Sequence, residues 1–374
     1  LIFDEASIIY RPHLMEFINT NDREVYYTRN TPPFKSVIYI YVILLMVSKF
    51  KFSKESYKKI YFKLINPKYI ITLIDNSIQF YTLKKYCPDA FIISIQSSHR
   101  MAVSDFFSKG KVYKKEKLYS DLIFVFNNYV ANKYKQFIKT KCVSIGSFES
   151  NNVKRKKTRK KFDILYISDF PFPFTVTKSN SDMRKEYISW DKFIAPVQNF
   201  LMNLSKYLEK KEQKLLILGR AVNPYESNLE KQYYEKIFKK NFTFIKNYEN
   251  RKKFDFIDKS KIVITINSTL GYESFSRGTK TAFFSVRAKN GLFKSTRFGW
   301  PAPVSLKGPC WTNDCSINEI HRVLNSLIKM SDKKWIKFRN KRMSSVLKYD
   351  PGNKKFFKTI KNLGFPINHK NINI

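Results

Sequence analysis

The sequence predicts an α/β protein of two doubly wound domains that face each other across a cleft. Short apolar runs rich in β-branched residues alternate with helical sequence, which is typical of buried parallel strands joined by helices. A polar, basic stretch near the middle interrupts this alternation once and separates two halves of similar size. The 374 residues, of which 43% are hydrophobic, are enough for two domains with ordinary cores.

The first domain is predicted over residues 1–148. Its strands are expected at residues 1–4, 24–29, 69–74, 90–95, 122–126 and 142–146, with helices over 34–48 and 54–64. Polar turns follow two of these strands, and they carry Asp75, Asn76, Gln96, His99 and Arg100. Because parallel strands end at one edge of a sheet, these residues are expected at the edge where α/β folds bind ligands.

Residues 149–161 are predicted to be a basic linker between the domains. A nucleic-acid-binding or nuclear-localisation segment has the same composition, but a solvated linker is the preferred interpretation. The second domain is predicted over residues 162–350, with strands expected at 162–168, 214–220, 242–245, 262–266 and 281–286. Residues 351–374 are expected to form a frayed tail.

A strand, a turn and a helix are predicted over residues 262–278. The β-branched run passes through the N-cap residues Ser268 and Thr269 into a helical segment that Gly278 closes. The free N–H groups of such a helix suit a phosphate. Thr269 and Glu273 share one face, so the hydroxyl can meet a phosphate while the carboxylate accepts hydrogen bonds from ribose hydroxyls. A capped core helix with a surface pair between Glu273 and Arg277 explains the same pattern.

The net charge of +40 suggests an anionic partner. The basic residues are spread along the whole chain, together with many Ile, Asn, Phe and Tyr residues, and an A+T-rich genome would produce this joint bias. No recognised nucleic-acid-binding module is present. Attraction to anionic lipid headgroups is therefore preferred over nucleic-acid binding.

Metal, cofactor and thiol chemistry have little support in the sequence. The motifs for dinucleotide binding, the P-loop, zinc hydrolysis and the nucleophile elbow are absent. Cys310 and Cys315 lack a second pair of ligands, so neither zinc nor another metal is expected. Four scattered cysteines fit a reducing cytoplasm, and the most apolar segment, residues 37–47, is too short to span a bilayer.

The remaining candidates for chemistry lie in turns after predicted strands. Asp75 can deprotonate an acceptor hydroxyl, and His99 can act as a base or as an electrophile. An N-cap aspartate and a hydrogen-bonded loop histidine explain these two residues equally simply. In the second domain, Gly219 precedes Arg220, and Arg287 follows a strand; both guanidinium groups can pair with a diphosphate or a sugar carboxylate.

Several short segments together resemble one family, the bacterial surface-carbohydrate (O-antigen) biosynthesis proteins. In the first half these are Asn66-Pro67-Lys68, residues 71–76, Phe80-Tyr81 and Ile95-Gln96. In the second half they are residues 269–273, Arg277-Gly278, Ser285-Val286-Arg287, residues 298–301 and residues 308–312. No single segment is a strong signature, but their order and spacing are fairly specific.

This resemblance implies a glycosyltransferase of the GT-B class, with two Rossmann-like domains and the donor nucleotide in the C-terminal one. Ser268, Thr269 and Glu273 match the phosphate- and ribose-binding helix of such enzymes, whereas Asp75 and His99 fall on the acceptor side. One departure concerns the turn after Gln96, where a glycine-rich sequence is expected and this chain has Ser97-Ser98-His99. Related teichoic-acid polymerases carry a loop histidine at roughly the position of His99.

The resulting hypothesis is a cytoplasmic, metal-independent glycosyltransferase at the inner face of the membrane. It would transfer a sugar from a nucleotide sugar to a surface-glycan or lipid-linked acceptor. Donor contacts are expected from Gly219, Arg220 and Arg287 in addition to the helix, and acceptor-side contacts from Asn76, Gln96 and Arg100. The alternatives are a nucleotide-sugar 2-epimerase, which would form an isomer without an acceptor, and a basic nucleic-acid-binding protein, which predicts one contiguous basic face.

Overall fold

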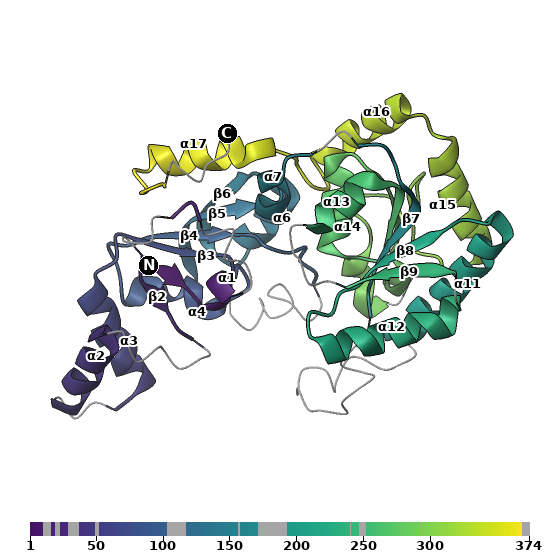
Figure 1. Cartoon of the computed structure of the whole chain (residues 1–374). Coiled ribbons are helices and arrows are strands. Elements are labelled where there is room, and N and C mark those ends of the chain that lie inside the picture. The colour runs from purple at the N-terminus through teal and green to yellow at the C-terminus, as the bar shows by residue number, and fades with distance from the viewer. Residues whose placement is uncertain are drawn as a thin grey trace. The chain divides into compact units, whose positions relative to one another are not determined.

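The computed structural model divides the chain into two compact units. It describes residues 1–9, 16–18, 23–28, 37–48, 52–102, 117–155, 158–170, 193–239, 241–246, 252–289 and 291–368. The first unit comprises Leu1–Ser97, Lys109–Asn152 and Asp350–Ile374, and the second comprises Ser98–Ser108 and Val153–Tyr349. Each unit is built on a six-stranded sheet in which every strand pair is parallel (Figure 1). The predicted α/β class with two Rossmann-like units is confirmed, while the predicted cleft stays a prediction.

The sheet of the first unit has the strand order β2-β1-β3-β4-β5-β6. Its strands are β1 (Ile2–Phe3), β2 (Val25–Tyr26), β3 (Tyr69–Thr72), β4 (Phe91–Ile95), β5 (Tyr119–Val125) and β6 (Lys139–Ser144). Its helices include α1 (Ala6–Ile9), α2 (Val37–Ser48), α3 (Lys54–Ile65), α4 (Ile78–Tyr81), α6 (Asn128–Lys135), α7 (Phe148–Asn152) and α17 (Lys354–Asn362). Fully buried Ile71, Ile93 and Phe124 form the centre of its core, as their apolar runs predict.

The C-terminal segment forms part of the first unit, so the prediction of a frayed tail was wrong. Helix α17 buries Phe356 and Ile360 completely, and the ring of Phe356 lies 4.6 Å from the rings of both Phe124 and Phe148. The side-chain amide of Asn353 donates to the Phe148 carbonyl over 2.9 Å. The predicted linker also differs at its start, because its first four residues continue helix α7. Residues 156 and 157 of the basic run lie outside the described residues.

The sheet of the second unit has the strand order β12-β11-β10-β7-β8-β9. Its strands are β7 (Phe162–Ile167), β8 (Leu215–Leu218), β9 (Phe242–Ile245), β10 (Ser260–Thr265), β11 (Lys280–Phe284) and β12 (Trp311–Thr312). Its α-helices include α11 (Ala195–Lys211), α12 (Pro224–Phe238), α13 (Lys252–Lys259), α14 (Thr269–Arg277), α15 (Ile317–Lys329) and α16 (Asp332–Met343). Central strands β7 and β10 are fully buried over most of their length, as expected when helices cover both faces.

Side chains of β7 alternate between the two faces of this sheet. Leu165 packs in a cluster with Phe254 and Ile257 of α13, whereas the ring of Tyr166 lies 6.5 Å from that of Phe200 on α11. Helices therefore cover both faces, which is the doubly wound arrangement. Such a sheet presents the turns after β7, β8 and β10 at one edge.

Candidate functional site

The strand-turn-helix unit predicted around residues 262–278 is present in the second unit. Strand β10 ends at Thr265, and α14 begins at Thr269 after a three-residue turn. The Ser268 side chain is the N-cap and accepts a hydrogen bond from the Leu270 N–H over 3.3 Å, while the Thr265 hydroxyl accepts one from the Ser268 N–H over 3.2 Å. The helix N-terminus thus lies at the carboxyl edge of the sheet, with its first turn held by two hydroxyls.

Helix α14 is held tightly at both ends of its short length. Gly278 ends it at a φ of +97°, and the Gly278 and Thr279 N–H groups donate to the carbonyls of Phe275 and Ser274. A Cβ atom on Gly271 would lie 2.3 Å from the Cγ2 atom of Thr265, so glycine is required for the helix to approach β10. The position of the helix N-terminus is consequently fixed by packing.

The surface pair between Glu273 and Arg277 does not form. Arg277 has a fully buried side chain, whose guanidinium pairs with the Asp258 carboxylate at 2.5 Å. Glu273 is only 2% exposed, one turn after Thr269 on the same helix. Within the alternative of a capped core helix, the surface pair is therefore wrong, whereas the capped and buried helix is present, and it carries a buried carboxylate close to its N-terminus.

His99 belongs to the second unit, which corrects its predicted place in the first domain. Its backbone N–H donates to the Thr269 hydroxyl over 2.8 Å, and its ring stacks on Tyr272 with a centroid distance of 4.3 Å and an interplanar angle of 18°. The Nε2 atom is buried and has no hydrogen-bond partner in the described part of the chain. The predicted turn histidine and the predicted phosphate-binding helix thus form one site.

The imidazole of His99 is neutral at physiological pH. Burial, and secondarily the positive charge of Arg100, lowers the pKa of His99 to about 3. A group with so low a pKa is a poor proton acceptor at neutral pH. Of the two predicted roles, the structure therefore favours the neutral hydrogen-bonding electrophile over the general base.

This depressed pKa predicts that acid destabilises the second unit through His99. Between pH 7.5 and pH 5 the unfolded chain protonates the imidazole near pH 6.5 while the folded chain does not, so the free energy of unfolding falls as pH falls. The loss attributable to His99 is about 2 kcal/mol at pH 5. Urea denaturation at both pH values, compared between wild type and His99→Gln, measures it. Equal losses in the two proteins would contradict the assignment.

Sequence reasoning missed the residues that support His99. Tyr272 was not singled out within its motif, yet its ring carries the imidazole, and its hydroxyl accepts a hydrogen bond from the Gly299 N–H over 3.3 Å. Tyr272 also stacks on Phe298, which in turn lies 4.8 Å from Trp311. The aromatic residues of segments 298–301 and 308–312 therefore form the wall behind the site.

Asp75 and Gln96 are buried in the first unit and hold the turn after β4. Asp75 is completely buried; its Oδ1 atom accepts from the Ser97 N–H at 3.1 Å and from the Ser97 hydroxyl at 3.2 Å, and Tyr134 donates to Oδ2. The Gln96 side-chain carbonyl accepts from the Phe126 N–H at 2.8 Å. These contacts explain both residues as supports of the turn.

Two other predicted acceptor-side residues lie in different surroundings. Asn76 is exposed in the turn that follows Asp75. Arg100 is only 6% exposed and belongs to the second unit, next to His99 in the chain. The predicted acceptor-side set is therefore not brought together within either unit.

The turn after β8 contains an exposed arginine above a buried carboxylate. Glu230 of α12 is completely buried and accepts hydrogen bonds from the Arg220 and Ala221 N–H groups at 2.9–3.0 Å. The Arg220 side chain is exposed, and its Nη1 atom donates to the Phe170 carbonyl over 3.3 Å. A Cβ atom on Gly219 would lie 2.7 Å from the Phe244 ring, so close packing explains this glycine without a ligand.

Arg287 is buried and engaged by the protein. It is 3% exposed, forms an ion pair of 2.6 Å with Asp169, donates from Nε to the Phe193 carbonyl over 2.9 Å, and lies 3.8 Å above the Phe193 ring. Asn290, three residues further along the chain, lies outside the described residues. Arg287 therefore supports the carboxyl edge of the sheet by packing.

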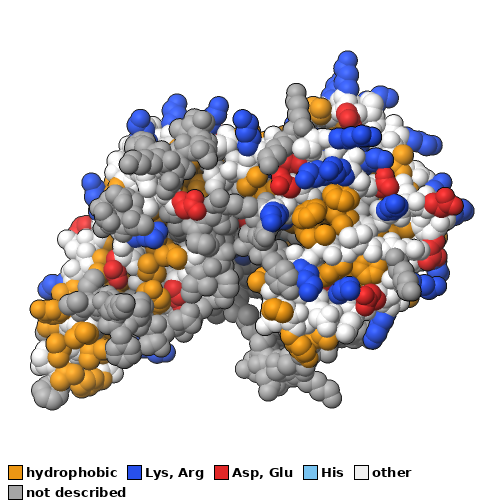
Figure 2. All heavy atoms as spheres, in the orientation of Figure 1, with side chains coloured by type: hydrophobic (Ala, Val, Ile, Leu, Met, Phe, Trp, Pro, Cys, Tyr) orange, Lys and Arg blue, Asp and Glu red, His pale blue; other side chains and the backbone are white. Residues whose placement is uncertain are grey.

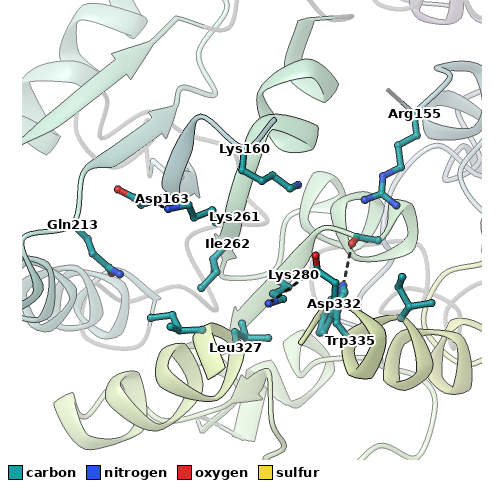
Figure 3. Close-up of a pocket in the computed structure, with 13 residues that line it drawn as sticks. Arg155, Lys160, Asp163, Gln213, Lys261, Ile262, Lys280, Leu327, Asp332 and Trp335 are labelled. Carbon is teal, nitrogen blue, oxygen red and sulfur yellow. Dashed lines mark hydrogen bonds and ion pairs between the residues drawn. The ribbon is translucent and has the colours of Figure 1, made fainter. Parts of the chain in front are cut away.

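A cavity of about 410 Å³ lies at the opposite edge of the same sheet (Figure 3). Lys160 and Asp163 at the start of β7, Lys261 in β10 and Lys280 in β11 line it, together with Trp335. Two of its lysines are paired, Lys261 with Asp163 at 2.7 Å and Lys280 with Asp332 at 3.4 Å. Because these residues lie at the amino ends of the strands, the cavity is distinct from the edge that carries α14.

A protein-family model matches most of the chain. The family is described as "putative O-antigen biosynthesis protein", and the match covers residues 93–364. It includes the last three residues of β4, His99 and the whole strand-turn-helix unit around α14. No curated protein matches the sequence.

Two solved structures with very different sequences share the two-unit fold, and a third is less similar. The S. aureus protein MnaA with UDP is 11% identical, with 97% of this chain and 96% of that chain covered and a TM-score of 0.50. The N. meningitidis UDP-GlcNAc 2-epimerase bound to UDP-GlcNAc is 10% identical, with 96% and 98% covered and a TM-score of 0.50. The pneumococcal O-GlcNAc transferase GtfA, in complex with UDP and GlcNAc, is 12% identical at a TM-score of 0.46; 83% of this chain is covered, and it spans 60% of that transferase.

Proposed function

Because this chain belongs to the O-antigen biosynthesis protein family, we propose that it is a glycosyltransferase that uses a nucleotide-sugar donor. The acceptor is a surface glycan or a lipid-linked precursor, and the reaction takes place in the cytoplasm at the inner face of the membrane. One observation supports this proposal above the others. The N-terminus of α14 lies at the carboxyl edge of the sheet with Thr269 in its first turn and the buried Glu273 on its second.

Each group at this edge has a distinct role in the proposed donor site. The Thr269 N–H and the hydroxyls of Ser268 and Thr269 bind the diphosphate, and the Glu273 carboxylate accepts hydrogen bonds from the ribose. The neutral imidazole of His99 offers a hydrogen bond through Nε2 beside the same helix N-terminus. The exposed guanidinium of Arg220 pairs with the leaving phosphate, whereas Arg287 acts through packing.

The proposed reaction needs no bound metal. Helix dipole, backbone N–H groups and a guanidinium together stabilise the negative charge that develops on the leaving diphosphate. No three His, Cys, Asp or Glu side chains of the described residues are grouped to hold a metal ion. The base that deprotonates the acceptor is not His99 in this proposal, and Asp75 positions the turn after β4.

Thermal-shift and product measurements test the proposed function. Among CMP, UDP, GDP and CDP, at least one nucleotide is expected to raise the melting temperature of the protein, because only the folded state binds it. With the matching nucleotide sugar, a transferase releases the nucleotide only when an acceptor is present. An isomerised sugar without an acceptor would instead identify a 2-epimerase, and salt-sensitive binding to oligonucleotides without any nucleotide effect would overturn both enzyme functions.

A further inference from the structure

Helix α2 of the first unit exposes an unusually apolar surface. Its twelve residues, Val37–Ser48, include no charged residue. Large apolar side chains that are at least half exposed follow one another along it, namely Ile40 (50%), Tyr41 (58%), Ile43 (56%), Leu44 (59%) and Val47 (50%). Burial of this surface in an apolar environment would be favourable.

The exposed side chains of α2 form one continuous face. At about 100° per residue, positions 40, 41, 43, 44 and 47 cover an arc of about 160°. The completely buried Val42 lies on the opposite side, where α2 packs against α3. Figure 2 shows hydrophobic side chains gathered where Figure 1 places α2 and α3. The helix therefore packs one face against α3 and leaves the large apolar side chains of the other face at least half exposed.

Helix α3, which packs against the other side of α2, adds positive charge to the hairpin. It carries Lys54, Lys58, Lys59 and Lys63 against one acidic residue, Glu55. The Glu55 carboxylate accepts a hydrogen bond from the Tyr86 hydroxyl over 2.6 Å. The hairpin of α2 and α3 thus combines an exposed apolar face with an excess of cations, which complements an anionic lipid surface.

A cavity of about 380 Å³ lies between the two helices and the end of β2. Lys54 and Lys58 line it together with Tyr57, and Phe52, which is 69% exposed, is also part of its wall. Cationic and hydroxyl groups beside an exposed aromatic ring suit the phosphate of a lipid headgroup.

We propose that the hairpin of α2 and α3 docks the first unit on an anionic phospholipid bilayer. Twelve residues span about 18 Å as a helix, less than the roughly 30 Å of a hydrocarbon core, so α2 lies along the interface. A second copy of the chain is a poorer partner for this face, because the lysines of the two hairpins would repel each other. The inference goes beyond the proposed function, because it assigns the membrane contact to one hairpin and does not depend on the reaction catalysed.

Vesicle co-sedimentation of the whole protein tests this docking. Wild type is expected to bind vesicles of phosphatidylcholine with phosphatidylglycerol, and to bind pure phosphatidylcholine vesicles and high-salt samples much less. Leu44→Glu is expected to reduce binding to the anionic vesicles at least about tenfold, because it puts a charge in the apolar face. Combined Lys54→Gln and Lys58→Gln is expected to remove most of the preference for anionic lipid.

Leu306→Glu provides the matched control, because Leu306 is 65% exposed in the second unit and is expected to leave vesicle binding unchanged. Equal binding by the Leu44→Glu and Leu306→Glu proteins would overturn the proposal. The proposal would also be overturned if wild type formed a dimer that did not bind vesicles and if Leu44→Glu dissociated that dimer into monomers in sedimentation velocity. The nucleotide-induced thermal shift of Leu44→Glu should match that of wild type, so failure of the donor site and failure of docking give different results.

Discussion

Replacement of Glu273 by alanine is expected to weaken nucleotide binding about 100-fold, as measured by isothermal titration calorimetry. A carboxylate that accepts two hydrogen bonds from ribose hydroxyls contributes about 3 kcal/mol, since hydrogen bonds to charged groups are worth about 1.5 kcal/mol or more each. In the proposed site the helix N-terminus still binds the diphosphate of the variant. The loss is therefore expected with nucleoside diphosphates and not with inorganic pyrophosphate.

Two further variants separate this effect from damage to the fold, because Glu273 is only 2% exposed. Glu273→Gln keeps the side-chain volume and is expected to lose about tenfold in affinity, since a neutral acceptor makes weaker hydrogen bonds. Glu235→Ala removes a carboxylate that is 46% exposed on α12 and is expected to bind nucleotide like wild type. Unchanged affinity in a correctly folded Glu273→Ala protein would remove Glu273 from the donor site.

Local chemistry made the strand-turn-helix unit predictable from the sequence. The N-cap at Ser268 and the left-handed C-cap at Gly278 depend on hydrogen bonds within a few residues, so residue types alone mark them. The apolar strands were predictable for a similar reason, because a parallel strand covered on both faces needs a continuous apolar run. Fold class and the edge of the sheet that carries α14 follow from these signals.

Contacts between distant segments were not predictable in the same way. The hydrogen bond from His99 to Thr269 joins residues 170 positions apart, and no local pattern assigns that turn to the second unit. Glu230 and Asp258 look like ordinary helix charges in sequence, yet both are buried and bind groups from other elements. Helix α17 was missed because its many lysines make the segment polar in sequence, so the i, i+4 pair of Phe356 and Ile360 does not stand out.

The largest effect on stability is expected at the buried pair of Asp258 and Arg277. Asp258 accepts from the Arg277 Nε over 3.2 Å and from Nη2 over 2.5 Å, and Nη1 donates to the Val153 carbonyl over 2.7 Å. The guanidinium also lies 4.8 Å above the Phe254 ring. Because Arg277 is the last residue of α14, this pair attaches the helix of the proposed donor site to α13.

Asp258→Ala is expected to lower the free energy of unfolding by about 4 kcal/mol, because the completely buried guanidinium of Arg277 then lacks its carboxylate partner. Urea denaturation followed by circular dichroism measures the change. Asp163→Ala is the matched control, because it breaks a surface pair in which Lys261 is 61% exposed and Asp163 is 38% exposed. It should change the free energy of unfolding by less than about 0.5 kcal/mol.

A double variant tests whether the penalty comes from the unpaired charge. Asp258→Leu combined with Arg277→Met removes both charges, so it is expected to be more stable than Asp258→Ala alone and to recover most of its loss. Recovery of nucleotide affinity in the same double variant would show that α14 needs a firm attachment rather than this particular ion pair. If the single variant is as stable as wild type, the buried pair does not hold α14 in place, and the rigidity argued for the donor site loses its main support.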